Sequence, residues 1–274
     1  EKKGFLAIQN KPQHIIDTIC DSGPLQQHLT FTEEQQNAFD VINKKLIALY
    51  SSNRITPALT TPLSPPSQGG EGGGGGLSHE GEVREINIFD GKNDALPCDV
   101  THKPGVILLH GITSSGKTEV YLQTIAKVLE HGRKAIFLVP EISLTSQTIQ
   151  RIKARFNNVA ILHSHLLGTF HYSQWNDIKE DKVDIVIGAR SSIFAPLKNV
   201  GLIIIDEEHE NTYKQENSPR YNARDVAILR AAYENAMVIL GTATPSLETY
   251  YNTITGHYEK IVLSKRIGNQ QLPP

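Results

Sequence analysis

The sequence predicts an α/β protein whose mainly parallel sheet is covered by helices on both faces. Six short apolar runs alternate with helical patterns from residue 106 onward. Strands that alternate with helices favour a parallel sheet with both faces buried. A glycine-rich turn joins the first run to the first helix, and polar residues follow four of the runs. Ligands of such sheets bind at the carboxyl ends of the strands, so these polar segments are candidates for one site.

The predicted strands are the runs at 106–109, 135–139, 159–162, 184–187, 202–205 and 237–240, and the helical patterns lie near 119–130, 143–155, 171–180 and 222–234. An earlier helix is expected at 31–50, where Thr32 is a good N-cap and Gln35 completes a capping box. Pro245 and Ser246 predict the start of a further helix.

The turn after the first strand matches the phosphate-binding pattern G-x-x-x-x-G-K-[ST]. Its residues are Gly111, Ile112, Thr113, Ser114, Ser115, Gly116, Lys117 and Thr118. The pattern lies between a strand and a helix, which is the context it needs. Backbone N–H groups and the helix N-terminus then face the phosphates. Lys117 is expected to reach the β- and γ-phosphates, and the Thr118 hydroxyl is expected to bind Mg²⁺.

Two other strand ends carry residues suited to hydrolysis. Asp206 and Glu207 follow a wholly apolar run, where buried carboxylates are costly unless a cation meets them. We expect Asp206 to bind Mg²⁺ and Glu207 to activate the attacking water. His209, Thr242 and Thr244 are expected to sense the γ-phosphate and couple it to the carboxylates.

Composition limits the function classes. The chain has 274 residues, a net charge of −2 and two cysteines, Cys20 and Cys98, that lack metal-ligand spacing. These values argue against a uniformly basic nucleic-acid coat, a disulfide framework and a zinc cluster in this stretch. No apolar run reaches the roughly 18 residues needed to span a bilayer, and no membrane partner is expected.

The chain divides unevenly. Residues 1–30 are too few to bury a core, and we expect them to be the tail of an upstream module. Residues 31–274 are expected to form one lobe, interrupted by a disordered Pro/Gly-rich insertion at about 51–82. Because the chain begins with Glu1 and stops at Pro274 after an apparent connecting stretch, a piece of a longer protein is expected.

The region from Gly105 to the end resembles the first motor lobe of superfamily 2 helicases of the D-E-x-H type, and among them the replication-restart helicases. The matching segments are Gly111–Tyr121, Leu138–Gln147, Leu162–Ser164, Val186–Ser191, Ile203–His209 and Gly241–Pro245. The resemblance implies a RecA-like P-loop NTPase lobe that drives 3′–5′ DNA unwinding with ATP and Mg²⁺. It also implies that Gln35 reads the adenine and that residues 1–30 end a winged-helix module.

Residues 213–225 resemble the aromatic-rich loop that replication-restart and RecQ helicases use to couple single-stranded DNA binding to ATP hydrolysis. Tyr rings can stack on unpaired bases and basic side chains can meet phosphates. The expected DNA-binding residues are Arg190, Ser191, Tyr213, Lys214, Arg220, Tyr221 and Arg224. Such contacts position a strand without reading its sequence.

The resemblance also implies partners that this stretch does not encode: forked and single-stranded DNA, primosome proteins and single-stranded DNA-binding protein. It places the protein in the cytoplasm, associated with the nucleoid. A zinc site and the second motor lobe are expected only in a missing C-terminal part, so the piece alone is expected to hydrolyse ATP hardly at all.

Some features depart from the family pattern or leave other functions open. Ser114 stands where the family usually has Gly, which the loop should tolerate provided that the position does not need a positive φ. The alternatives are another superfamily 2 translocase, such as an RNA helicase, and a nucleic-acid-binding scaffold that keeps ATP as a structural ligand. A small-molecule kinase would leave the motifs at the other strand ends unexplained.

Overall fold

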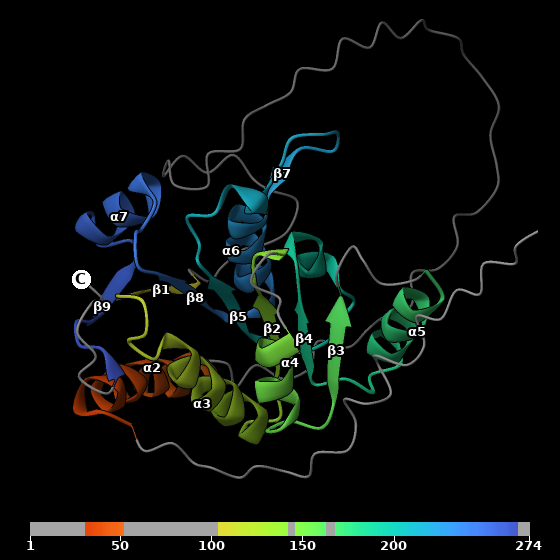
Figure 1. The fold of residues 1–274 in the computed structure, drawn as a ribbon, viewed down its shortest axis with the longest axis horizontal. Coiled ribbons are helices and arrows are strands. Elements are labelled where there is room, and N and C mark those ends of the chain that lie inside the picture. The colour runs from red at the N-terminus through yellow and green to blue at the C-terminus, as the bar shows by residue number, and fades with distance from the viewer. Residues whose placement is uncertain (1–30, 52–103, 142–145, 163–167, 268–274) are drawn as a thin grey trace, which may run out of the picture.

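A seven-stranded parallel sheet forms the centre of the molecule (Figure 1). The computed structural model describes residues 31–51, 104–141, 146–162 and 168–267. The strand order is β3-β4-β2-β5-β8-β1-β9. The strands are β1 (Gly105–Gly111), β2 (Lys134–Leu138), β3 (Val159–Leu162), β4 (Ile185–Gly188), β5 (Val200–Asp206), β8 (Met237–Thr242) and β9 (Glu259–Leu263).

All six predicted strands are present and pair in parallel, which confirms the fold expected from the sequence. β9 was not predicted. It pairs with β1, begins with two charged residues, Glu259 and Lys260, and has Val262 52% exposed. Such a half-exposed strand lacks the continuous apolar run that marks a buried one.

Helices cover both faces of the sheet (Figure 1). On one face α2 (Glu33–Ser51), α3 (Lys117–Glu130) and α4 (Ser146–Lys153) contribute to one apolar cluster. On the other face α5 (Gly168–Lys179) and α6 (Ala223–Glu234) contribute to a second cluster. α7 (Leu247–Ile254) joins the first turn of α6 through Arg224. Apart from β9, the strands are therefore covered on both sides, and their polar groups emerge at the strand ends.

A short antiparallel hairpin extends from the body of the protein beyond α6 (Figure 1). Its strands are β6 (Lys214–Gln215) and β7 (Tyr221–Asn222), and the 3₁₀ turn η3 (Asn211–Tyr213) leads into it. Asn222 ends the hairpin and caps α6, because its side chain accepts a hydrogen bond from the Arg224 N–H. A second 3₁₀ turn, η2 (Arg190–Phe194), follows β4. For the segment that forms β6 and β7, the sequence predicted a loop but not the hairpin pairing.

The register brings the strand ends to one level. Asp206 of β5 pairs with Gly241 of β8, and His110 of β1 pairs with Thr242. Leu138 of β2 lies beside Ile205 of β5. The segments that follow β1, β5 and β8 therefore meet at one edge of the sheet, as parallel strands require.

Several predicted features lie outside the described residues: the upstream tail at 1–30, most of the insertion at about 51–82, and His163 and Ser164. Within the described ranges, no helix has both the length and the hydropathy to cross a membrane.

Candidate functional site

The phosphate-binding loop lies between β1 and α3, as predicted. Gly116 precedes α3 with φ 83°, a left-handed conformation that glycine adopts without strain. Lys117 is 7% exposed, and its Nζ donates to the Gly111 carbonyl at 2.9 Å. The same Nζ lies 3.8 Å from Glu207 Oε1. The ammonium group is thus held at the centre of the strand edge by the loop on one side and the acidic segment on the other.

The loop was expected to tolerate Ser114 provided that this position does not need a positive φ, and the structure does not meet that condition. Its φ is 66°, in the left-handed region, where an L-residue other than glycine carries about 1–2 kcal/mol of strain. The Ser114 carbonyl also accepts a hydrogen bond from the Ile267 N–H at 3.0 Å. The loop therefore keeps its turn at a cost that the glycine usual in the family would avoid.

Gln35 links α2 to the loop. Its Oε1 accepts from the Thr32 N–H at 2.9 Å, which confirms the predicted capping box. Its Nε2 donates to the Ser115 carbonyl at 2.9 Å, and the side chain is 2% exposed. In this conformation one end of the amide caps the start of α2 and the other contacts the phosphate loop, and the expected adenine contact of Gln35 stays a prediction.

Asp206 and Glu207 stand at the end of β5, opposite the loop. Asp206 Oδ1 accepts a hydrogen bond from the Tyr121 hydroxyl at 3.0 Å. Burial, and then the neighbouring Glu207 carboxylate, raise the pKa of Asp206 above its ordinary value. Glu207 adopts φ 47° and is about one-third exposed at its side chain. The strand end thus presents two partly buried carboxylates next to Lys117.

His209 and Thr242 contact each other, as the coupling role requires. His209 Nδ1 lies 2.8 Å from Thr242 Oγ1, and 3.7 Å from Glu207 Oε2. Thr244 contributes its main chain, because its N–H donates to Thr242 Oγ1 at 3.1 Å. The Thr244 side chain is exposed. A chain of contacts therefore runs from Lys117 through Glu207 and His209 to the end of β8.

Glu208 was not assigned a role from the sequence, yet it is the most buried carboxylate of the acidic segment. Its side chain is 0% exposed. Oε1 accepts from the Ser246 N–H at 2.7 Å, and Oε2 accepts from the Ser246 and Thr249 hydroxyls at 3.0 Å each. Arg224 Nη1 lies 3.4 Å from Oε2. We call these four residues the Glu208 cluster; it ties β5 to the starts of α6 and α7.

Two of the expected DNA-binding residues, Tyr213 and Arg224, point inward in this structure. Tyr213 is 2% exposed, and its hydroxyl donates to the Asp206 carbonyl at 2.7 Å, so its ring offers no face to a base. Arg224 is 14% exposed at its side chain and is held in the Glu208 cluster. Both were assigned from the resemblance to the aromatic-rich loop and from residue type, and the packing of the hairpin base turns them inward.

The remaining candidates lie nearer the surface. Lys214, Arg220 and Ser191 are exposed, whereas Tyr221 is half-buried. Tyr221 packs edge-on against Phe194, with ring centroids 5.0 Å apart. Phe194 is 51% exposed and was missed, because an aromatic residue inside the segment after Ser191 carries no distinguishing signal in the sequence.

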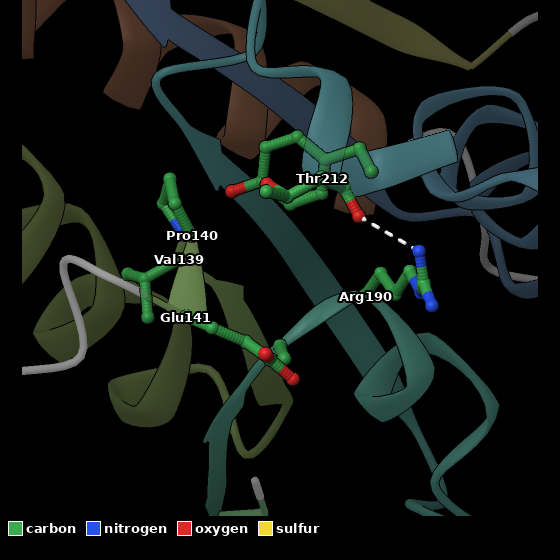
Figure 2. Close-up of a pocket in the computed structure, with 7 residues that line it drawn as sticks. Val139, Pro140, Glu141, Arg190 and Thr212 are labelled. Atoms are coloured by element: carbon green, nitrogen blue, oxygen red, sulfur yellow. Dashed lines mark hydrogen bonds between the residues drawn. The ribbon is translucent and has the colours of Figure 1, made fainter. Parts of the chain in front are cut away.

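Arg190 lies on the rim of a cavity of about 110 Å³ beside the hairpin base (Figure 2). Its Nη1 donates to the carbonyls of Thr212, at 3.3 Å, and Lys214, at 2.8 Å. Glu141 extends into the same space from the end of β2 (Figure 2). Arg190 therefore fastens the first arm of the hairpin to the segment after β4, and its contact with DNA stays a prediction.

The loop fits a nucleoside triphosphate with Mg²⁺ by its own chemistry. Ser115 Oγ is buried and lacks a hydrogen-bond partner among the described residues, and Lys117 keeps two further N–H donors beyond the one given to Gly111. Thr118 stands in the first turn of α3, where the partial positive charge of the helix favours anions. Asp206 and Thr118 offer the oxygen ligands that Mg²⁺ prefers.

A parallel sheet with a phosphate loop after β1, an acidic D-E-E-H segment after β5 and a threonine contact from β8 defines a P-loop nucleotide-binding lobe. The chain belongs to the DEAD/DEAH box helicase family, whose model matches residues 95–253, more than half of its length. Members of this family use ATP with Mg²⁺.

The curated relatives point to one branch. The chain is 53% identical over 186 residues to the replication restart protein PriA of Bacillus subtilis. The matched region covers 68% of this chain and 23% of that protein. The chain is 50% identical over 165 residues to PriA of Haemophilus influenzae, covering 60% and 23%. The chain spans about a quarter of the length of these relatives. A solved structure, RecG bound to a three-way DNA junction, is similar with a TM-score of 0.45 and 23% identity, covering 61% of this chain and 22% of that one.

Proposed function

We propose that this chain is the first motor lobe of an ATP-dependent 3′–5′ DNA helicase that acts in replication restart. The observation that carries the proposal is the contact between Lys117 and Glu207, which joins a phosphate loop to a candidate hydrolytic carboxylate across the strand edge. The relatives with 50% and 53% identity, both named replication restart protein, support the restart role.

Each residue of the site has a proposed task in hydrolysis. The loop amides, Lys117 and the N-terminus of α3 bind the triphosphate. Asp206 and Thr118 hold Mg²⁺, which neutralises charge on the β- and γ-phosphates. Glu207 orients a water and accepts its proton, and His209 passes the state of that carboxylate to Thr242.

DNA binding is proposed for the exposed part of the hairpin region. Lys214 and Arg220 meet backbone phosphates, whereas Tyr221 and Phe194 form an aromatic pair beside which an unpaired base can stack. Arg190 and Ser191 lie at the base of this surface. Forked DNA, primosome proteins, single-stranded DNA-binding protein and a cytoplasmic, nucleoid-associated location belong to the same proposal, as do a zinc site and a second lobe in the remainder of the protein.

The test is a Glu207→Gln substitution in the full-length protein. The amide keeps the shape of the side chain and loses the base, so DNA-stimulated ATP turnover falls about 10²–10⁴-fold while ATP binding persists. Glu248→Gln, an exposed position in the first turn of α7, is the matched control and keeps turnover near wild type. Unchanged turnover in the Glu207 variant excludes the catalytic assignment of Glu207, whereas absence of DNA-stimulated turnover in the wild-type protein favours a scaffold with structural ATP.

A comparison of nucleic acids tests the polymer. Single-stranded DNA is expected to stimulate the ATPase of the full-length protein more than RNA of the same sequence. Stronger stimulation by RNA assigns the chain to an RNA helicase instead.

A further inference from the structure

Asp206 is held at its side chain by a buried tyrosine from the helix that follows the phosphate loop. The Tyr121 hydroxyl donates to Asp206 Oδ1 at 3.0 Å, and Tyr121 is 0% exposed. The ring packs edge-on against Phe137 in the cluster under α2 and α3, with centroids 5.6 Å apart. A phenylalanine would fill the same apolar space, so the feature that tyrosine adds is the hydroxyl and its bond to Asp206.

β8 is the strand between β1 and β5, and it leaves room for the contact between Tyr121 and Asp206 at Gly241. Gly241 of β8 pairs with Asp206, and a Cβ built on Gly241 would lie 1.5 Å from the Tyr121 hydroxyl oxygen and 3.4 Å from Asp206 Oδ1. Any side chain at this position therefore collides with Tyr121. The contact between Tyr121 and Asp206 therefore requires a glycine at position 241, within a strand whose residues are all buried.

The main chain of Asp206 is fixed independently from the opposite layer. The Tyr213 hydroxyl donates to the Asp206 carbonyl at 2.7 Å and lies 3.3 Å from the Leu138 carbonyl. With the backbone held by sheet pairing and by Tyr213, the side-chain torsions are the freedom that remains to Asp206. Tyr121 restricts those torsions.

We infer that Tyr121 is a positioning residue that orients the Asp206 carboxylate for Mg²⁺, and that Gly241 provides the space for its hydroxyl. The inference rests on the proposed role of Asp206 as a ligand of nucleotide-bound Mg²⁺. An oriented carboxylate binds the cation without first losing rotational freedom, and supporting groups behind a metal ligand are expected to tune its affinity.

The test compares nucleotide affinity with and without Mg²⁺ in the full-length protein, using a fluorescent ATP analogue in Mg²⁺ and in EDTA. Tyr121→Phe is expected to weaken binding about three- to tenfold in Mg²⁺, the loss of one hydrogen bond, and to leave binding in EDTA unchanged. The concentration of Mg²⁺ that gives half-maximal ATPase activity rises by a similar factor.

Tyr50→Phe is the matched control. The Tyr50 hydroxyl donates to the Gly201 carbonyl at 3.0 Å, near the opposite end of the same strand β5. This variant loses a tyrosine hydroxyl and a hydrogen bond to β5 but keeps the wild-type Mg²⁺ dependence.

Gly241→Ala provides a second, independent measurement. It displaces the Tyr121 hydroxyl and is expected to reproduce the loss of Mg²⁺-dependent affinity, and its effect is smaller in a Tyr121→Phe background because the 1.5 Å contact is gone. Equal affinities of Tyr121→Phe and wild type in Mg²⁺, or an equal loss in Mg²⁺ and EDTA, overturns the inference. If the wild-type protein binds the nucleotide equally well in Mg²⁺ and in EDTA, that result overturns the proposed function instead.

Discussion

Replacing Glu208 by alanine should destabilise the fold far more than replacing an exposed glutamate does. The side chain is 0% exposed and accepts three hydrogen bonds from Ser246 and Thr249 in addition to the Arg224 contact. Truncation leaves these donors and a guanidinium group facing a cavity. Removing one partner of a buried ion pair costs about 3–5 kcal/mol.

The lower end of that range applies, because Arg224 is 14% exposed and its guanidinium group can still reach water. A loss of about 3 kcal/mol lowers the unfolding temperature by about 6–12 °C, taking roughly 2–4 °C per kcal/mol for a domain of this size. Circular dichroism or calorimetry of purified Glu208→Ala measures it.

Glu180→Ala is the control for the loss of one glutamate. Glu180 pairs with Lys182 on the surface, with its side chain 58% exposed, and its removal leaves the unfolding temperature unchanged within error. If Glu208→Ala unfolds within about 2 °C of this control, a shift worth less than roughly 1 kcal/mol, then the Glu208 cluster is not a buried network and the reasoning fails.

Two further outcomes concern backbone strain and alkaline pH. Ser114→Val places a β-branched residue at φ 66° and should lower the free energy of unfolding by about 1–2 kcal/mol in denaturant titrations. Ser114→Gly should not lower it. Equal stability of the two variants would contradict the left-handed conformation of the loop at this residue. Burial raises the pKa of Tyr50 to about 12, against a smaller lowering effect of Arg133, and burial likewise raises the pKa of Tyr258 to about 12. Between pH 10 and 12 the folded protein keeps these protons while the unfolded chain loses them, so the free energy of unfolding falls as pH rises, by at most about 2–3 kcal/mol per tyrosine. Tyr50→Phe should flatten this fall in unfolding titrations at several alkaline pH values, and an unchanged slope would show that Tyr50 titrates normally.

The sequence predicted the strands and the loop because their signals are local. A continuous apolar run such as 202–205 can be buried in only a few ways, and the G-x-x-x-x-G-K-T pattern contains its own turn and helix start. The capping box of Thr32 and Gln35 is local in the same sense, and it is present. For such features neighbouring residues determine the structure.

Side-chain direction in the hairpin region could not be predicted in the same way. Tyr213 and Tyr221 are both tyrosines beside basic residues, yet one is buried under β5 and the other is half-exposed. The difference arises from η3, which directs the Tyr213 hydroxyl to the Asp206 and Leu138 carbonyls. That geometry depends on two strands distant in sequence, as does the burial of Glu208.

The place of β1 in the sheet has a consequence for biosynthesis. Both of its neighbours, β8 and β9, come from the last forty residues of the described chain, well over a hundred residues after β1. During translation β1 emerges long before either partner, so its two edges stay unpaired while β2, β3, β4 and β5 can already associate. The strand that carries the phosphate loop is therefore among the last to be enclosed. A chain truncated before residue 237 would lack both strands that flank β1 and the Thr242 contact of His209.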